Sequence, residues 1–384
     1  MITEGIRFLN FKKKINIKKT KQNLNLILSE KNQVIQSLSK DYKNSFKKKK
    51  IIKYKKNLNF RVIGMGGSTL GSQTIYSFLE KKIKKNFWFE DNLQNNFKKK
   101  NNKNLVNLVI SKSGNTIETI VNSNILIKKE NKNIFITENK KNYLYLLAQK
   151  LKAEIIHHNN YIGGRYSVLS EVGMVPAELM GLKSENFRQL NLLIKNKKFI
   201  NSLIANVNST LFFIKNKKYN SIIINYDEKS ENFFKWYQQL VAESLGKKNT
   251  GLLPIVSNMP KDNHSVMQLY LDGFKNNFFT FFYVHDQNSK KINNKVIFNS
   301  HKYLKNKNLS NIIYAQKKAT ENIFKLKNIP FRSFEIYKRD EKTLGELFTF
   351  FILETILLGK ALNLNPYDQP AVELIKKETK KLLV

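Results

Sequence analysis

Short apolar runs alternate with longer stretches of helical periodicity along most of this chain. Leu105–Ile110 reads LVNLVI, a run too short for helical periodicity, and it predicts a strand buried on both faces, as in a parallel sheet. Further strands are predicted at 134–137 and Glu154–His157, with a stretch of helix length before each. Such alternation predicts a parallel, doubly wound α/β sheet.

A second series of the same kind begins after about residue 190. Its predicted strands are 221–225, 252–256, 278–284 and 331–337. Helices are predicted at 232–245 and, at the end of the chain, at 344–362 and 371–383. We therefore expect two α/β domains in tandem. The predicted divisions are an N-terminal helical arm (1–55), a first α/β domain (56–190), and a second α/β domain that includes the C-terminal helices (191–384).

Residues able to bind a phosphate follow the strand at Leu105–Ile110. Ser111, Ser113 and Thr116 supply hydroxyls, Lys112 supplies an ammonium, and Gly114 permits a left-handed backbone. A helix opening near Thr116 would add free amide donors at the carboxyl end of a strand, where open α/β sheets bind ligands. The stretch predicts a phosphate site, although by itself it also fits a polar capped turn.

Two glycine-rich turns also follow apolar runs that are predicted to be strands, as the phosphate-site stretch does. In FRVIGMGGSTLG, a short apolar run leads into Gly67, and a helix is predicted to begin near Ser68. Dinucleotide-binding folds begin similarly, but no acidic residue stands at the end of a second strand to contact a ribose. In YIGGRYS, Gly164 lets the backbone approach a ligand closely and Arg165 adds a permanently charged donor. Taken alone, Ser68 also fits a helix cap and Arg165 a surface arginine.

The composition favours a cytoplasmic globular protein. The chain has 384 residues, 41% of them hydrophobic, with no cysteine, no apolar signal core at its start and no apolar run long enough to span a membrane. The formal net charge of +39 is large, but the lysines are mixed with asparagines throughout and form no stripe interleaved with aromatic residues. We expect no specific nucleic-acid partner, and an electropositive surface that can steer an anionic substrate.

Six blocks in order carry a resemblance to a known family. They read IGMGGSTLG, SKSGNTIET, GGRYSVLSEVG, QQLVAESLGK, PKDNHSVMQLYLDG and NPYDQPAVELIKK, and they cover most of the chain from Val62 onward. The chain resembles the glucose-6-phosphate isomerase family in its shorter bacterial form. The resemblance implies two sugar-isomerase (SIS-type) domains with parallel sheets, and a homodimer whose active sites lie at the subunit interface.

The resemblance also implies a role for individual residues. Glu243 matches the base that moves a proton between C1 and C2, and Arg165 matches the group that stabilises the enediolate. His264, contributed by the neighbouring subunit, and Lys376 match the pair that opens the sugar ring. The expected substrate-binding residues are Gly67, Ser68, Ser111, Lys112, Ser113, Thr116, Gly164, Gln239 and Gln369.

The chemistry of an aldose-ketose isomerase fits these residue types. A carboxylate, an arginine and a His-Lys pair can open a ring, move a weakly acidic proton and hold the resulting oxyanion, and this reaction requires no metal or cofactor. Two alternatives stay open: another SIS-type sugar-phosphate isomerase, such as a dual glucose/mannose or glucosamine-6-phosphate-forming enzyme, and a non-catalytic sugar-phosphate sensor. The chain departs from the family at Ala371, where glycine is usual, and at Tyr367. A glycine needed for a positive φ would make Ala371 cost ~1 kcal/mol.

Overall fold

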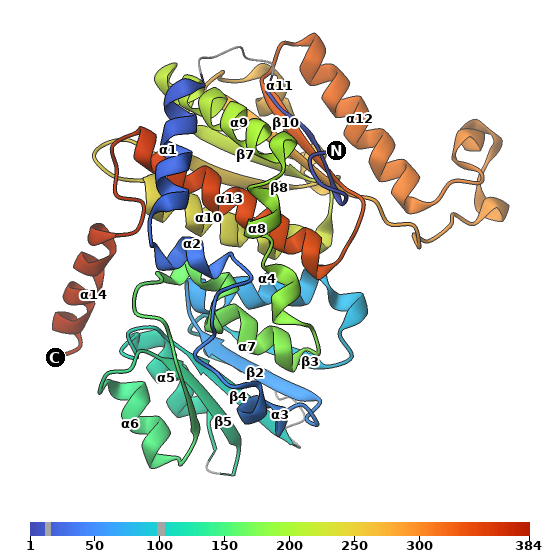
Figure 1. The fold of residues 1–384 in the computed structure, drawn as a ribbon. Helices are drawn as coiled ribbons and strands as arrows, with labels where there is room; N and C mark the ends of the chain where they lie inside the picture. The colour runs from blue at the N-terminus through green and yellow to red at the C-terminus, as the bar shows by residue number, and fades with distance from the viewer. Residues whose placement is uncertain (12–16, 98–103, 129) are drawn as a thin grey trace.

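Two five-stranded sheets, each with helices on both faces, lie one above the other in the molecule (Figure 1). This computed structural model describes residues 1–11, 17–97, 104–128 and 130–384. The predicted fold class, two tandem α/β units with parallel sheets, is confirmed. The predicted boundaries at residues 55 and 190 stay a prediction.

The first sheet is parallel throughout, with the strand order β3-β2-β4-β5-β6. Its strands are β2 (Asn59–Gly64), β3 (Asn86–Glu90), β4 (Leu105–Ile110), β5 (Lys132–Thr137) and β6 (Glu154–His157). Alternate residues of β4 face opposite sides: Val109 packs towards α5 (Ile117–Leu126) and α6 (Tyr143–Lys150), whereas Leu108 joins the core that includes α4 (Leu70–Phe78) and α7 (Glu171–Leu179). Burial on both faces explains why the strand reads as one continuous apolar run.

The second sheet has the order β1-β10-β9-β7-β8, and all its strands except β1 run parallel. The strands are β1 (Ile6–Leu9), β7 (Asn220–Asn225), β8 (Leu253–Asn258), β9 (Asn277–Val284) and β10 (Phe331–Ile336). One face packs on α9 (Lys197–Lys215), α10 (Glu231–Leu245) and α13 (Glu341–Ala361). The other packs on α11 (Met267–Asp272) and α12 (Leu309–Leu326).

The N-terminal segment differs from the predicted helical arm. It contains α1 (Lys18–Ser29), α2 (Gln33–Ser37) and α3 (Lys48–Ile52), but β1 precedes them and pairs antiparallel with β10, with Ile6 opposite Ile336. The segment thus contains helices, as predicted, together with one strand that the sequence did not predict. Four residues give too short a run to show strand alternation, and the partner strand lies more than 300 residues away in sequence.

The two units share one apolar core. Helix α10 of the second unit packs against α4 of the first, and α13 is buried from Thr343 to Gly359. A single cluster of buried apolar side chains contains residues of both sheets, among them Val62 of β2 and Ile223 of β7. The short α8 (Leu190–Leu193) joins the same cluster. This shared core fixes the loops of one unit relative to the helices of the other.

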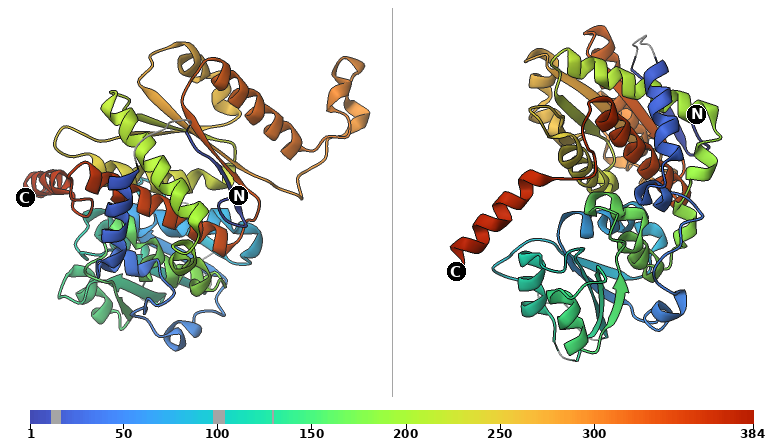
Figure 2. Two further views of the ribbon diagram at one scale, coloured as in Figure 1. Left: turned by 45° about the horizontal axis from the view of Figure 1, so that its top comes forward. Right: turned by 60° about the vertical axis from the view of Figure 1, so that its left-hand side comes forward.

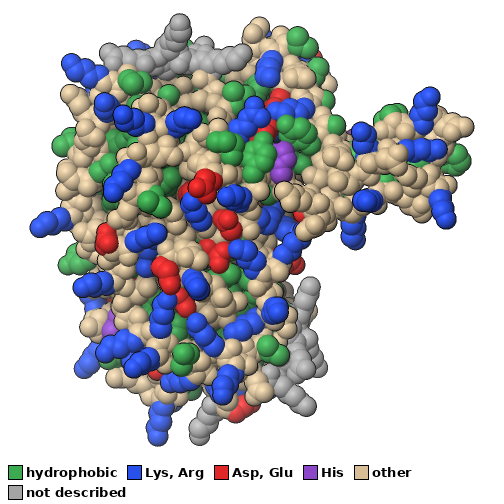
Figure 3. Space-filling model, turned by 45° about the vertical axis from the view of Figure 1, so that its right-hand side comes forward, with side chains coloured by type: hydrophobic (Ala, Val, Ile, Leu, Met, Phe, Trp, Pro, Cys, Tyr) green, Lys and Arg blue, Asp and Glu red, His purple; other side chains and the backbone are tan. Residues whose placement is uncertain are grey.

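Two segments project from the body. The C-terminal helix α14 (Pro370–Leu382) extends away from both sheets and contains no buried residue (Figure 2). The stretch between β9 and α12 forms the second projection, coloured orange in Figure 1. Lysine and arginine side chains are scattered over the face shown in Figure 3 rather than gathered in one stripe. Among the described residues, no helix has both the length and the apolar character needed to cross a membrane.

Candidate active site

The phosphate-site residues and the first glycine-rich turn lie side by side at the carboxyl edge of the first sheet. β2 and β4 are neighbours, with Gly64 opposite Ile110, so the chain leaves both strands at the same edge. Residues 111–116 follow β4, and the turn that contains Gly67 and the half-buried Ser68 follows β2. Both loops occupy the edge at which ligands bind in open α/β sheets.

The loop after β4 is held in shape by α6. Gly114 has φ +65°, and a Cβ there would lie 1.9 Å from Oδ1 of Asn142, so only glycine fits. The carbonyl of Gly114 accepts a hydrogen bond from Leu144 N at 3.1 Å, and Asn115 Oδ1 accepts one from Tyr143 N at 3.1 Å. The loop is thus a preorganised cradle rather than a free turn.

Donors inside this cradle are left for a ligand. Thr116 is the N-cap of α5, yet its side chain caps no amide of that helix; its hydroxyl instead lies 2.9 Å from Ser111 Oγ. First-turn amides without a cap favour an anion. Ser113 is exposed beside them, with its hydroxyl 3.3 Å from Asn115 N, and the half-exposed Lys112 lies 3.6 Å from Glu138. The geometry suits a phosphate.

Arg165 is buried rather than on the surface, with 1% of its area exposed. It follows Gly164 in a 3₁₀ turn, Gly164–Leu169. Its guanidinium donates to side chains and to backbone carbonyls of the segment before α14. The acceptors are Ser244 Oγ (2.7 Å), Glu243 Oε2 (3.1 Å), Gln369 Oε1 (2.7 Å), Pro366 O (2.7 Å) and Asp368 O (3.0 Å).

Glu243 stands at the centre of this arrangement. One of its carboxylate oxygens pairs with Arg165 and the other accepts a hydrogen bond from Gln239 Nε2 at 2.9 Å. Gln239 lies one turn earlier on α10, as its spacing predicts, and its buried Oε1 has no hydrogen-bond partner among the described residues. An unpartnered buried acceptor beside a carboxylate points to a polar ligand that would complete it.

A cleft of about 860 Å³ opens beside Glu243. Its walls are the end of α10 and the segment that leads into α14, including Gln369 and Ala371. Lys247 and Asp368 form an ion pair of 2.6 Å at this cleft, and that hydrogen bond lowers the pKa of Asp368. The volume lies within the range of small-molecule sites.

Gly67 brings two loops of the first unit close together at this point. A Cβ on Gly67 would lie 2.2 Å from the carbonyl carbon of Gly164 and 2.7 Å from the nitrogen of Arg165. A Cβ added at Gly164 would make only an ordinary van der Waals contact, 3.9 Å from Gly67 Cα. The close backbone contact with Gly164 requires glycine at position 67, and the predicted approach of Gly164 to a ligand stays a prediction.

The structure does not bring His264 or Lys376 into this group. His264 is exposed at the end of a short 3₁₀ turn, Lys261–His264, after β8. Lys376 lies on the projecting helix α14 and pairs with Glu373 of the same helix at 2.6 Å. The expected strain at Ala371 is absent, because Ala371 lies inside α14 and is not among the residues with positive φ.

Sequence reasoning missed the residues that hold Arg165. Ser244 and Tyr166 are buried beside it, and Pro366 and Asp368 contribute only backbone carbonyls. Ser244 and Tyr166 immediately neighbour Glu243 and Arg165 in the blocks AESLGK and GGRYS. That adjacency was the available signal, whereas carbonyl acceptors leave none in a sequence.

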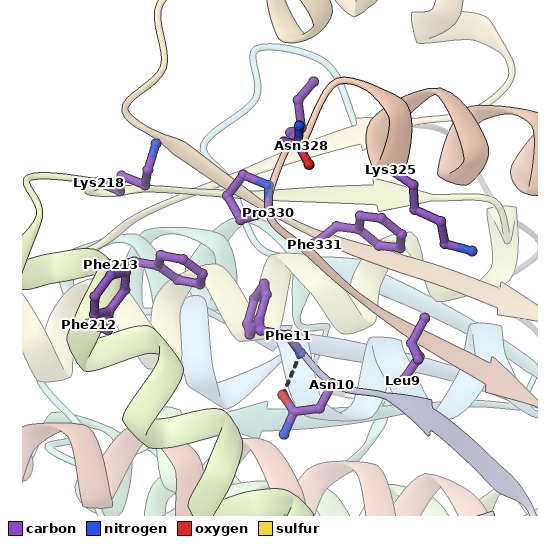
Figure 4. A pocket seen from close by; sticks show the side chains of 11 residues that line it. Leu9, Asn10, Phe11, Phe212, Phe213, Lys218, Lys325, Asn328, Pro330 and Phe331 are labelled. Atoms are coloured by element: carbon purple, nitrogen blue, oxygen red, sulfur yellow. Dashed lines mark hydrogen bonds between the residues drawn. The ribbon is translucent and has the colours of Figure 1, made fainter. Parts of the chain in front are cut away.

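Another cavity, of about 380 Å³, lies in the second unit, next to the start of β10 (Figure 4). Its lining includes Phe11, Phe213 and Phe331 and none of the predicted site residues. Among the described residues, no cluster of three or more His, Cys, Asp or Glu side chains could hold a metal ion. The polar groups that could act on a sugar phosphate are thus gathered at the carboxyl edge of the first sheet and beside α10.

Comparison with known proteins finds similar sequences and similar folds. A glucose-6-phosphate isomerase of Methanocaldococcus jannaschii is 33% identical over 344 residues, covering 83% of this chain and 82% of that protein. A crystal structure of a hypothetical protein from Thermus thermophilus matches with a TM-score of 0.84 at 19% identity, over 96% of this chain and 94% of that one. A glucose-6-phosphate isomerase from Chlamydia trachomatis matches with a TM-score of 0.73 at 15% identity, over 99% and 89%.

The two structural neighbours share the fold. The family model described as phosphoglucose isomerase extends over residues 25–383 and includes all six sequence blocks and every strand except β1. The resemblance drawn from those blocks is therefore confirmed, and this chain belongs to the phosphoglucose isomerase family.

Proposed function

We propose that this chain interconverts D-glucose 6-phosphate and D-fructose 6-phosphate through a cis-enediolate, a step of glycolysis and gluconeogenesis that takes place in the cytoplasm. Membership of the family and the name of the relative at 33% identity support this activity. The observation that carries it is the contact of Glu243 with Arg165 at 3.1 Å, beside a cleft and an unpartnered amide oxygen.

The chemistry follows from the position of these two groups. Glu243 takes the proton from C2 of the open-chain aldose and returns it to C1, as a carboxylate can do without a second base. The enediolate that forms carries negative charge on oxygen. The buried guanidinium of Arg165 is fixed before the substrate arrives and needs little reorganisation to stabilise that charge.

The phosphate group of the substrate is placed in the cradle after β4. Ser111, Ser113 and Thr116 would donate hydroxyl hydrogen bonds, and the first-turn amides of α5 would add backbone donors. The phosphate does not change charge during isomerisation, so these contacts contribute mainly to binding and orientation. Gln239 and Gln369 would contact the sugar hydroxyls.

We further propose a homodimer in which His264 of the neighbouring subunit completes the site across an interface and pairs with Lys376. Within one chain, Lys376 is on a helix without buried residues and His264 is exposed. Apolar side chains recur on α14 at helical spacing and stay exposed, among them Val372, Ile375 and Leu382. An unpartnered apolar helix face of this kind suits contact with a second copy.

The projection between β9 and α12 gives the same indication. Val296, Phe298 and Tyr303 are at least 66% exposed on it. Two projecting segments with exposed apolar side chains suit an arrangement in which each subunit holds the other. Subunit exchange between inactive variants, described in the Discussion, tests this arrangement.

The activity itself is tested by a coupled assay with fructose 6-phosphate, in which glucose 6-phosphate is oxidised by its dehydrogenase. Glu243→Gln keeps the hydrogen-bonding geometry and removes the base, so isomerisation should fall by at least about 100-fold. Glu231→Gln is the matched control, because Glu231 lies on the same helix and pairs with Lys235 at the surface.

Isotope exchange makes the test specific to the proton transfer. The parent should incorporate deuterium at C2 from heavy water, and Glu243→Gln should lose both exchange and isomerisation. If the variant exchanges deuterium at the parent rate, another group moves the proton. A parent chain that converts neither sugar phosphate would overturn the proposed function as a whole.

A further inference from the structure

All five N–H groups of the Arg165 guanidinium have acceptors within the protein. They divide into two sets. Nε and Nη2 donate to Ser244 and to backbone carbonyls of residues 366 and 368, which do not belong to the predicted substrate site. Nη1 donates to Glu243 and Gln369, both of which do. Nη1 is therefore the nitrogen that faces the reaction.

A closed ring of hydrogen bonds holds the other edge. The hydroxyl of Tyr166 donates to Pro366 O at 2.9 Å and lies 2.8 Å from Ser244 Oγ. Pro366 O also accepts from Arg165 Nη2, and Ser244 Oγ accepts from Arg165 Nε. A carbonyl can only accept and a guanidinium can only donate. The single hydroxyl hydrogen of Tyr166 is used on Pro366 O, so Ser244 must donate to Tyr166, and both arms of the ring run from the guanidinium to that carbonyl.

The ring is out of contact with water. Tyr166 and Ser244 have no exposed area, Arg165 has 1%, and burial raises the pKa of Tyr166, which keeps its hydroxyl protonated as the donor that the ring needs. Buried hydrogen-bond networks are stronger than exposed ones, and they leave a costly unpaired group when one member is removed. The indole of Trp236 donates to the carbonyl of Arg165 at 3.1 Å and fixes its backbone.

We propose that Tyr166 and Ser244 are positioning residues for the isomerisation. Neither needs to touch the substrate. Together they hold the Nε and Nη2 edge of Arg165 against the protein, so that Nη1 alone is presented to the enediolate. This inference rests on the proposed function of Arg165, and it adds the atom that acts and the two hydroxyls that orient it.

Tyr166→Phe and Ser244→Ala test it, because each removes one hydroxyl and keeps the shape of the side chain. Each should lower kcat for fructose 6-phosphate by about tenfold and change KM by less than about twofold, as expected for a contact made mainly in the transition state. Tyr237→Phe is the matched control. Tyr237 is a buried tyrosine of α10 whose hydroxyl faces Arg332 instead, at 3.5 Å.

A double-mutant cycle separates positioning from general stability. In an Arg165→Lys background there is no Nε to hold, so removing either hydroxyl should change kcat by less than about twofold. If Tyr166→Phe or Ser244→Ala lowers kcat as much in the Arg165→Lys background as in the parent, the proposal is wrong. A loss confined to KM, or an equal loss in Tyr237→Phe, would overturn it too.

A measurement without substrate distinguishes this inference from the proposed function. The chain has six arginines, so ¹⁵N spectra of their Nε–H groups are simple to assign by substitution. The Arg165 Nε–H should exchange with water at least about 100-fold faster in Ser244→Ala than in the parent, because its acceptor is lost. If the Arg165 Nε–H exchanges at the parent rate in Ser244→Ala, the inference is wrong even if the enzyme is active. Faster exchange in a chain that converts no sugar phosphate would leave the ring established and the catalytic assignment wrong.

Discussion

Replacing Gly67 by alanine should damage both stability and turnover, although position 67 carries no side chain that could react. The added Cβ would lie 2.2 Å from the carbonyl carbon and 2.3 Å from the carbonyl oxygen of Gly164, and 2.7 Å from the nitrogen of Arg165. All three contacts are with backbone, so no side-chain rotation relieves them. The loop after β2 and the turn that carries Arg165 must separate by about 1 Å to reach ordinary contact distance.

A displacement of this size has a predictable cost. Misplacing a catalytic group by about 1 Å can lower the rate about 100-fold, and overpacking a closed contact typically costs about 1–3 kcal/mol. We expect Gly67→Ala to lose about 100-fold in kcat and to unfold at lower urea concentration. Coupled-assay kinetics and urea unfolding followed by tryptophan fluorescence measure the two effects.

The neighbouring glycines supply the control. Gly163 has φ −68°, and a Cβ there would lie no nearer than 3.8 Å to any atom; at Gly164 the nearest would be 3.9 Å away. Gly163→Ala and Gly164→Ala should therefore keep near-parent stability. Parent-like kcat and urea midpoint in Gly67→Ala, or equal damage from Gly163→Ala, would refute the reasoning.

Three further predictions follow from the geometry. Ser113→Ala with Thr116→Val should raise KM for fructose 6-phosphate more than it lowers kcat, and calorimetry should detect weaker binding of the sugar phosphate; parent-like affinity would contradict the phosphate cradle. Mixed His264→Ala and Glu243→Gln chains should regain activity after subunit exchange, whereas a fully active monomer by light scattering would exclude the shared site. Burial lowers the pKa of His158 from 6.5 to about 4. The neutral His158 should therefore contribute fully to the free energy of unfolding above pH 6.5, and about 3 kcal/mol of that contribution should be lost as the pH falls towards 4. His158→Gln should make the urea midpoint less dependent on pH over this range.

Much of the fold could be predicted from local pattern because the central strands of both sheets are buried on two faces. Leu105–Ile110 and Glu154–His157 begin and end where the apolar runs predict. β3 and α12 were not predicted. β3 is a five-residue edge strand, NFWFE, and α12 follows a long projection that interrupts the alternation of elements. The insertion weakens the periodic signal before α12; edge position alone does not explain why β3 was missed, since the edge strand β6 was predicted.

The site was only partly accessible from sequence. Glu243 and Gln239 share a helix face because helical geometry requires it. The partners of Arg165 depend instead on which distant segment of the chain packs against it. Pro366 and Asp368 accept through backbone carbonyls, which every residue possesses. In the proposed homodimer, the position of His264 relative to the base would depend on a second chain, and no pattern within one chain encodes that distance.

The pairing of β1 with β10 sets an order for folding during synthesis. All strands of the first sheet lie between residues 59 and 157, so that sheet can close while the rest of the chain is still being made. Ile6 cannot meet Ile336 until the ribosome has added about 330 residues, which takes some tens of seconds at about 5–20 residues per second. The earliest residues of the chain are therefore among the last to reach their native neighbours, and a chain truncated before β10 would leave its own N-terminus without a place to dock.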